Sequence, residues 1–111
     1  MPAAARLAVS LVAAAWLSAT LSPCGAAAAE VTVKIANFTF VPQTLSVPVG
    51  TTVTWVNDDD IPHVVAEKSA TFRSKALDTG DKFSHVFAKA GKVEYYCAIH
   101  PHMTGEIVVT P

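Results

Sequence analysis

Most of this chain alternates apolar and polar side chains with a period of two. The alternation recurs in short runs that Gly, Pro, Asn or Asp residues separate: 31–35, 44–49, 52–55, 83–87, 92–96 and 107–109. Such a period buries one face of a β-strand, and the segments after residue 29 lack the 3.6-residue stripe of an amphipathic helix. The pattern therefore predicts an all-β fold of seven or eight short strands, either an antiparallel sandwich or a small barrel.

The first 29 residues have the composition of a secretory signal peptide. Arg6 supplies a small positive region, and residues 7–21 are apolar apart from Ser and Thr. Ala27–Ala29 then offers an A-x-A cleavage site. We therefore predict residues 1–29 as a signal peptide, and a mature protein that is periplasmic or secreted and has no membrane span. A retained membrane anchor and a lipoprotein attached through Cys24 are the two alternatives.

The mature domain predicted at residues 30–111 is small and slightly acidic. It carries seven Lys and Arg, the chain's eight minus Arg6, against nine Asp and Glu, which gives a net charge of about −2. This balance argues against nucleic-acid binding. Because Cys24 would leave with the signal peptide, Cys97 would be the only cysteine of a domain exported to where cysteines usually pair. A lone thiol in that setting favours a metal-ligand role.

Three residues with metal-binding side chains follow the predicted strand at 92–96. Cys97, His100 and Met103 have Cys-x2-His-x2-Met spacing, and His63 lies 34 residues upstream of the cysteine in a proline-marked loop. One thiolate, two imidazoles and a weak thioether are the donor set of copper sites that cycle between Cu(I) and Cu(II). A lone cysteine also argues against a dicopper centre, which needs a second bridging thiolate. The sequence therefore predicts one copper ion per chain.

Three motifs together resemble the cupredoxins, the small blue copper proteins. They are Pro42-x-x-Leu45-x-Val47-x-x-Gly50-x-x-Val53-x-Trp55-x-Asn57, Ile61-Pro62-His63 and Tyr96-Cys97-x-x-His100-x-x-Met103. The short loop from Cys97 to Met103, with Pro101 after His100, is most similar to that of amicyanins, since plastocyanins and pseudoazurins have longer loops. The resemblance covers nearly the whole mature chain. It implies a Greek-key β-sandwich with type 1 copper held by His63, Cys97, His100 and, axially, Met103.

The resemblance also implies the function of an electron carrier. One electron would pass through the exposed edge of His100 during brief docking with redox partner proteins, such as a c-type cytochrome and a dehydrogenase or oxidase. A monomer without enzymatic activity is expected. The alternative is a periplasmic protein that scavenges, stores or delivers copper without electron transfer, and an enzyme or a metal-free sandwich is less favoured.

The chain departs from the family pattern at Val64. Cupredoxins usually have a polar residue there, most often Asn, whose side chain ties the two ligand loops together. The backbone N–H of Val64 is still expected to donate a hydrogen bond to the Cys97 sulfur. Asp58–Asp60 is interpreted as a solvated turn, with a docking patch for a basic partner as the alternative. Trp55 is expected in the core. Of the two other histidines, His85 is expected to be a sheet side chain and His102 an exposed loop side chain.

Overall fold

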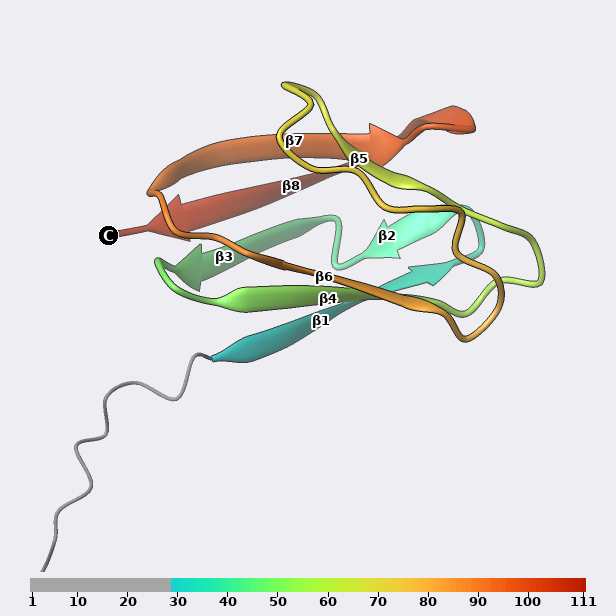
Figure 1. Ribbon diagram of the computed structural model, residues 1–111, viewed down its shortest axis with the longest axis horizontal. Helices are drawn as coiled ribbons and strands as arrows, with labels where there is room; N and C mark the ends of the chain where they lie inside the picture. The colour runs from blue at the N-terminus through green and yellow to red at the C-terminus, as the bar shows by residue number, and fades with distance from the viewer. Residues whose placement is uncertain (1–28) are drawn as a thin grey trace, which may run out of the picture.

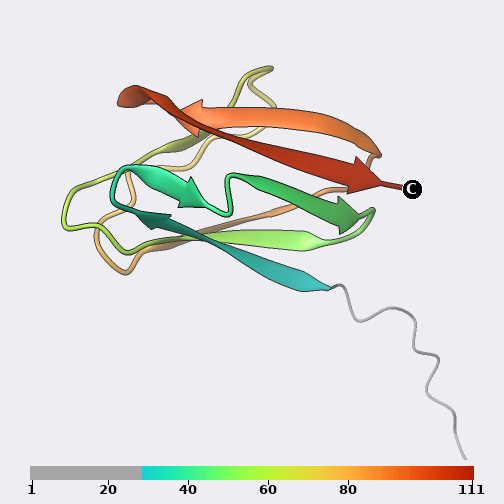
Figure 2. The ribbon, with the colours of Figure 1, turned by 180° about the vertical axis from the view of Figure 1, so that it is seen from behind.

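The computed structural model describes residues 29–111, which form two packed four-stranded sheets (Figures 1 and 2). One sheet has the order β2-β1-β4-β6 and the other the order β3-β8-β7-β5. The strands are β1 (Glu30–Ala36), β2 (Thr39–Val41), β3 (Thr44–Pro48), β4 (Thr52–Asn57), β5 (Val65–Glu67), β6 (Lys82–Val86), β7 (Gly91–Cys97) and β8 (His100–Thr110). The predicted all-β sandwich is confirmed, and residues 29–111 contain no helix, hence none that could cross a membrane.

Both sheets are mixed rather than wholly antiparallel. β1 runs parallel to β4 and β3 runs parallel to β8, whereas the remaining neighbours are antiparallel. The sequence pattern missed these two pairings because alternation reports which face of a strand is buried and carries no information on the direction of its neighbour. It also gave no signal for β2 and β5, which are only three residues long.

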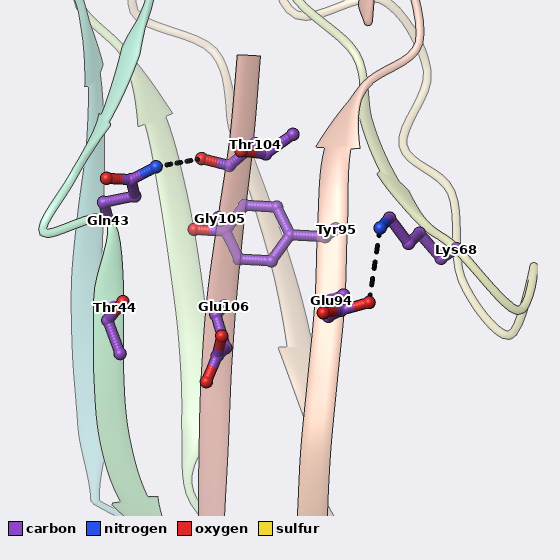
Figure 3. Close-up of a pocket in the computed structure, with 8 residues that line it drawn as sticks. All are labelled: Gln43, Thr44, Lys68, Glu94, Tyr95, Thr104, Gly105 and Glu106. Atoms are coloured by element: carbon purple, nitrogen blue, oxygen red, sulfur yellow. Dashed lines mark hydrogen bonds and ion pairs between the residues drawn. The ribbon is translucent and has the colours of Figure 1, made fainter. Parts of the chain in front are cut away.

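Aromatic side chains form a cluster in the core between the sheets. Trp55 is fully buried, as predicted, with the rings of Phe72, Phe83, Phe87 and Tyr95 around it. Tyr95 lies across Gly105 of the neighbouring strand, where a Cβ would overlap the ring (Figure 3). His85 is a half-buried sheet side chain, as expected, and its ring stacks on Phe72 at 4.3 Å between centroids.

Candidate metal centre

The end of the β7–β8 hairpin brings Cys97 and His100 together. Cys97 is the last residue of β7 and His100 the first of β8, and the two pair across a two-residue turn after a register shift at Tyr96/Cys97. The Cys-x2-His spacing therefore places the two residues opposite each other on the two strands of a hairpin. Three residues further along β8, Met103 is 5% exposed and belongs to the core, whereas Pro101 and His102 are exposed.

His63 reaches the same place from the loop between β4 and β5. Its backbone pairs with Leu77 through two hydrogen bonds, one in each direction, of 3.1 and 2.7 Å. The buried Asn57 amide donates to the carbonyls of Ile61 and Leu77, both at 2.8 Å, and its oxygen accepts from the Asp59 N–H at 2.9 Å. These contacts close the loop around the fully buried His63.

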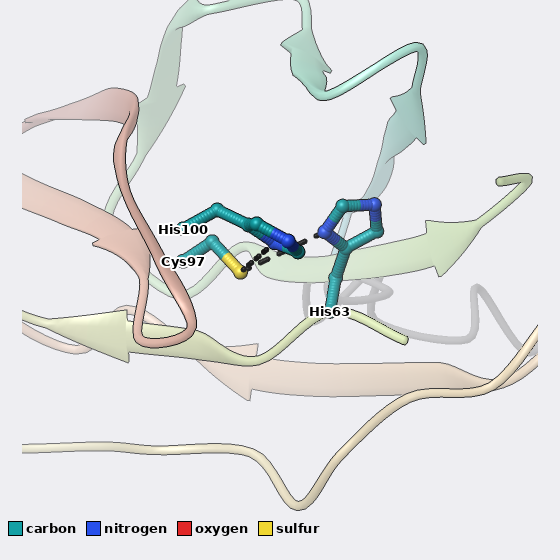
Figure 4. Close-up of side chains that lie close together, drawn as sticks. All are labelled: His63, Cys97 and His100. Atoms are coloured by element: carbon teal, nitrogen blue, oxygen red, sulfur yellow. Dashed lines mark hydrogen bonds between the residues drawn. The ribbon is translucent and has the colours of Figure 1, made fainter. Parts of the chain in front are cut away.

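The donor atoms of the three residues face one another (Figure 4). The Cys97 Sγ lies 3.6 Å from His63 Nδ1 and 3.5 Å from His100 Nδ1, and one ligand atom from each residue lies within 4.8 Å of the others. A first-row metal ion with bonds of about 2.3 Å to sulfur and 2.0–2.1 Å to nitrogen separates such atoms by roughly 3.6–3.8 Å at trigonal to tetrahedral angles. The arrangement therefore fits a metal ion, and its donor chemistry of one thiolate sulfur and two imidazole nitrogens fits copper.

Asp59 determines which nitrogen of His63 faces the sulfur. Its carboxylate lies 2.8 Å from His63 Nε2. Burial raises the pKa of Asp59, but hydrogen bonds from the Phe38 N–H, His63 and the Asn37 N–H outweigh burial and lower the pKa overall. An ionised carboxylate accepts a hydrogen bond, so we assign the imidazole proton to Nε2 and the free lone pair to Nδ1.

Backbone contacts connect the two loops where the side-chain tie is missing. The Val64 N–H donates to Cys97 Sγ at 3.4 Å, as expected from the sequence, and the Ala98 N–H donates to the Val64 carbonyl at 3.0 Å. Val65 also pairs with Cys97 in the β5–β7 ladder. The loops are therefore held together by the sheet itself, and the sulfur has a hydrogen-bond donor that does not depend on a polar side chain at position 64.

Sequence reasoning missed three residues around the site. Asn57 was noticed only as part of a motif, and Asp59 was assigned to a solvated turn, which the structure corrects: Asp58 and Asp60 are exposed, but the Asp59 carboxylate turns inward to His63. Phe38 gave no signal, although its ring contacts His63 and His100. Each of the three also has a partner at least 20 residues away in the chain, such as Leu77 for Asn57, and local patterns do not report such pairs.

Exposed apolar side chains surround the outer edge of His100. A shallow hollow is lined by Phe38, Ile99, His100, Pro101, His102 and Met103. Phe38 and Ile99 are 53% and 51% exposed. His102 is exposed, as predicted, but it lies in β8 and not in a loop, and it is outside the group formed by His63, Cys97 and His100.

Residues 7–109 match the family model described as a cupredoxin-like domain. The match begins inside the segment predicted as a signal peptide, and residues 1–28 lie outside the part the structure describes, so the cleavage site and the domain boundary stay predictions. Amicyanin from Paracoccus denitrificans is 36% identical over 75% of this chain and 71% of its own length. Amicyanin from Paracoccus versutus is 31% identical over 71% of this chain, which spans only 64% of that relative.

Solved structures show the same similarity. A purple cupredoxin from Nitrosopumilus maritimus superposes with a TM-score of 0.66 and 37% identity, covering 74% of this chain and 99% of that one. A mutant of amicyanin in its oxidized state has a TM-score of 0.69 and 32% identity over 73% of this chain and 82% of its own. A copper-containing nitrite reductase from Thermus scotoductus has a TM-score of 0.69 and 33% identity over 74% of this chain, but this chain covers only 22% of the reductase.

Proposed function

Because this chain belongs to the cupredoxin family, close to the amicyanins, and its cofactor is one type 1 copper ion, we propose that it is a one-electron carrier. His63, Cys97 and His100 would bind the metal, with Met103 as the axial ligand. When bound, copper would supply one-electron exchange between Cu(II) and Cu(I). The chain itself holds the donors, keeps water away from them and offers a path to the surface.

One observation carries this proposal: the strands and loops of the protein themselves bring the three donors together. Cys97 and His63 are fully buried, and both imidazoles present Nδ1 to the sulfur at 3.5–3.6 Å. Sheet pairing fixes both sides of Cys97. Donors that are held in place move little when the charge at the site changes, and such preorganisation is what fast electron transfer needs.

The position of His100 supports electron transfer through its outer edge. His100 is half-buried, and the hollow around it presents Phe38, Ile99 and Pro101 to a partner. A small apolar surface suits brief docking with redox proteins such as c-type cytochromes and dehydrogenases. The predicted signal peptide supports export to the periplasm, where the protein would act.

The site supports a carrier over an enzyme. Within residues 29–111, His63, Cys97 and His100 form the one group of three His, Cys, Asp or Glu side chains close enough to bind a metal. The related reductase is a much longer protein, of which this chain covers 22%. A second metal for substrate chemistry would therefore have to come from elsewhere.

A visible absorption spectrum of the mature protein with added Cu(II) tests the proposal. We expect an intense thiolate-to-copper band that reductant bleaches, that Cys97→Ser abolishes and that the exposed-site control His102→Ala keeps. Fast electron exchange with a c-type cytochrome should accompany it. Copper binding without the band, or a band without electron exchange, would contradict the carrier and favour copper storage or delivery.

A further inference from the structure

Phe38 has a backbone conformation that its side chain disfavours. Asn37 and Phe38 form the turn between β1 and β2, with φ angles of 52° and 59°. A two-residue hairpin with positive φ at both positions favours Asn at the first and Gly at the second, because an L side chain is strained there. A phenylalanine in that second position is 53% exposed, so burial in the core does not explain it.

The Asp59 carboxylate holds this turn in place. Its two oxygens accept hydrogen bonds from the backbone N–H groups of Asn37 and Phe38, the latter at 3.0 Å. The same carboxylate accepts from His63 Nε2 at 2.8 Å. One side chain therefore fixes both the strained turn and the imidazole, and it couples the position of the Phe38 ring to that of His63.

The Phe38 ring meets both imidazoles of the site edge to face. Its centroid lies 5.8 Å from that of His63 at an interplanar angle of 90°, and 5.3 Å from that of His100 at 87°. The two imidazoles are 5.1 Å apart at 61°. Aromatic rings prefer this geometry, which restrains each ring's rotation. The three rings come from three separate segments and converge on one point.

We propose that Phe38 is a positioning residue that holds the imidazoles of His63 and His100 with both Nδ1 atoms toward Cys97. The inference rests on the proposed ligand set and adds a restraint to it. His100 needs this restraint most, because it is only half-buried at the hairpin end and the Val64 side chain has no polar group to tie the loops. The strained turn then has a purpose, because it places the Phe38 ring against the two imidazoles.

Four variants separate the ring from the turn. Phe38→Ala removes the ring, Phe38→Gly removes the ring and relieves the turn, and Phe38→Tyr keeps an aromatic ring. Asn37→Gly is the matched control, since it relieves the neighbouring turn position and leaves the ring. Each is studied by NMR of the histidine rings in the metal-free protein and by the rate of copper loss to a chelator.

We expect Phe38→Ala and Phe38→Gly to speed copper loss about tenfold and to give His100 ring signals that average over several orientations. Phe38→Tyr and Asn37→Gly should resemble the wild type in both measurements, and Phe38→Gly should melt above Phe38→Ala because its turn is unstrained. Wild-type rates and ring signals in Phe38→Ala would overturn the proposal. A wild type that binds no copper would instead defeat the proposed function, and the ring signals of the metal-free variants would still test Phe38.

Discussion

Two segments meet at the metal centre and are held in different ways. The ligand hairpin, residues 97–103, brings Cys97 and His100 together across a two-residue turn at the end of a strand ladder. The upstream loop, residues 57–63, begins at the last pair of the β1–β4 ladder, Ile35 with Asn57, and beyond it has only the single bridge from His63 to Leu77. Between these two pairs it depends mainly on the side-chain hydrogen bonds of Asn57 and Asp59 to carbonyl and amide groups.

This difference determines which kind of substitution disturbs each segment. Backbone hydrogen bonds in the hairpin are present whatever the side chains are, so only a change that forces strands apart will disturb it. In the loop, a few polar side chains carry the geometry, so removing one of them leaves buried groups without partners. We therefore expect single polar substitutions to damage the loop and only steric substitutions to damage the hairpin.

Asn57→Ala should have the largest effect. The substitution removes two hydrogen bonds to the carbonyls of Ile61 and Leu77 and one acceptor for the Asp59 N–H, at a fully buried position. We expect a loss of about 2–4 kcal/mol in the free energy of unfolding, measured by urea denaturation of the metal-free protein. Asp58→Ala, at an exposed neighbouring position, is the control and should change stability by less than about 0.5 kcal/mol.

Equal, small effects of these two substitutions would break the comparison, because the loop would then not depend on its polar contacts. A large effect of Asn57→Ala on stability with an unchanged copper spectrum would limit the comparison to stability. The contacts would then stabilise the fold without orienting His63.

Gly105→Ala tests whether a steric clash disturbs the β7–β8 hairpin. A Cβ at this position would overlap the Tyr95 ring, which is rigid and fully buried (Figure 3). We expect a loss of about 1–3 kcal/mol by the same denaturation measurement. Thr104→Ala, exposed on the same strand, should cost much less. If the double variant Gly105→Ala/Tyr95→Leu were no better than Gly105→Ala alone, the steric explanation would be wrong.

The same difference explains what the sequence could predict. Alternation predicted the sandwich, and the spacing of Cys97, His100 and Met103 predicted a ligand loop after the strand at 92–96, because both are local patterns along the chain. The structure instead begins β8 at His100, so the ligands lie on a hairpin. His63 was proposed as a ligand from its proline-marked loop and the donor set that copper prefers, and its likeness to a family motif supported it. The inward turn of Asp59 was not predictable, since in the sequence it is one of three adjacent aspartates, and only its contacts with Asn37, Phe38 and His63 distinguish it.

His85 predicts a smaller, pH-dependent effect away from both segments. Burial against Phe72 lowers its pKa from the ordinary value of 6.5, and the nearby Glu67 charge only partly opposes this. The unfolded chain therefore binds the proton more readily, so the His85 contribution to stability is present above about pH 6.5 and is lost as the pH falls below it. Melting temperatures from pH 8 to 5 should fall less steeply in His85→Gln than in the wild type. A slope that His85→Gln does not alter would contradict the lowered pKa.

The smallest effect is expected at the ion pair between Lys68 and Glu94 (Figure 3), which joins the residue after β5 to β7. Its atoms are 3.3 Å apart, but both side chains are about half exposed, and the Lys68 N–H already donates to the Glu94 carbonyl at 3.0 Å. Because the backbone makes this connection and water screens the charges, Glu94→Gln should change the free energy of unfolding by less than about 0.5 kcal/mol. Added salt should lower the stability of the wild type by no more than about the same amount. A loss of the size expected for Asn57→Ala would mean that side-chain contacts carry the strand ladder as well, and the contrast between the two segments would then fail.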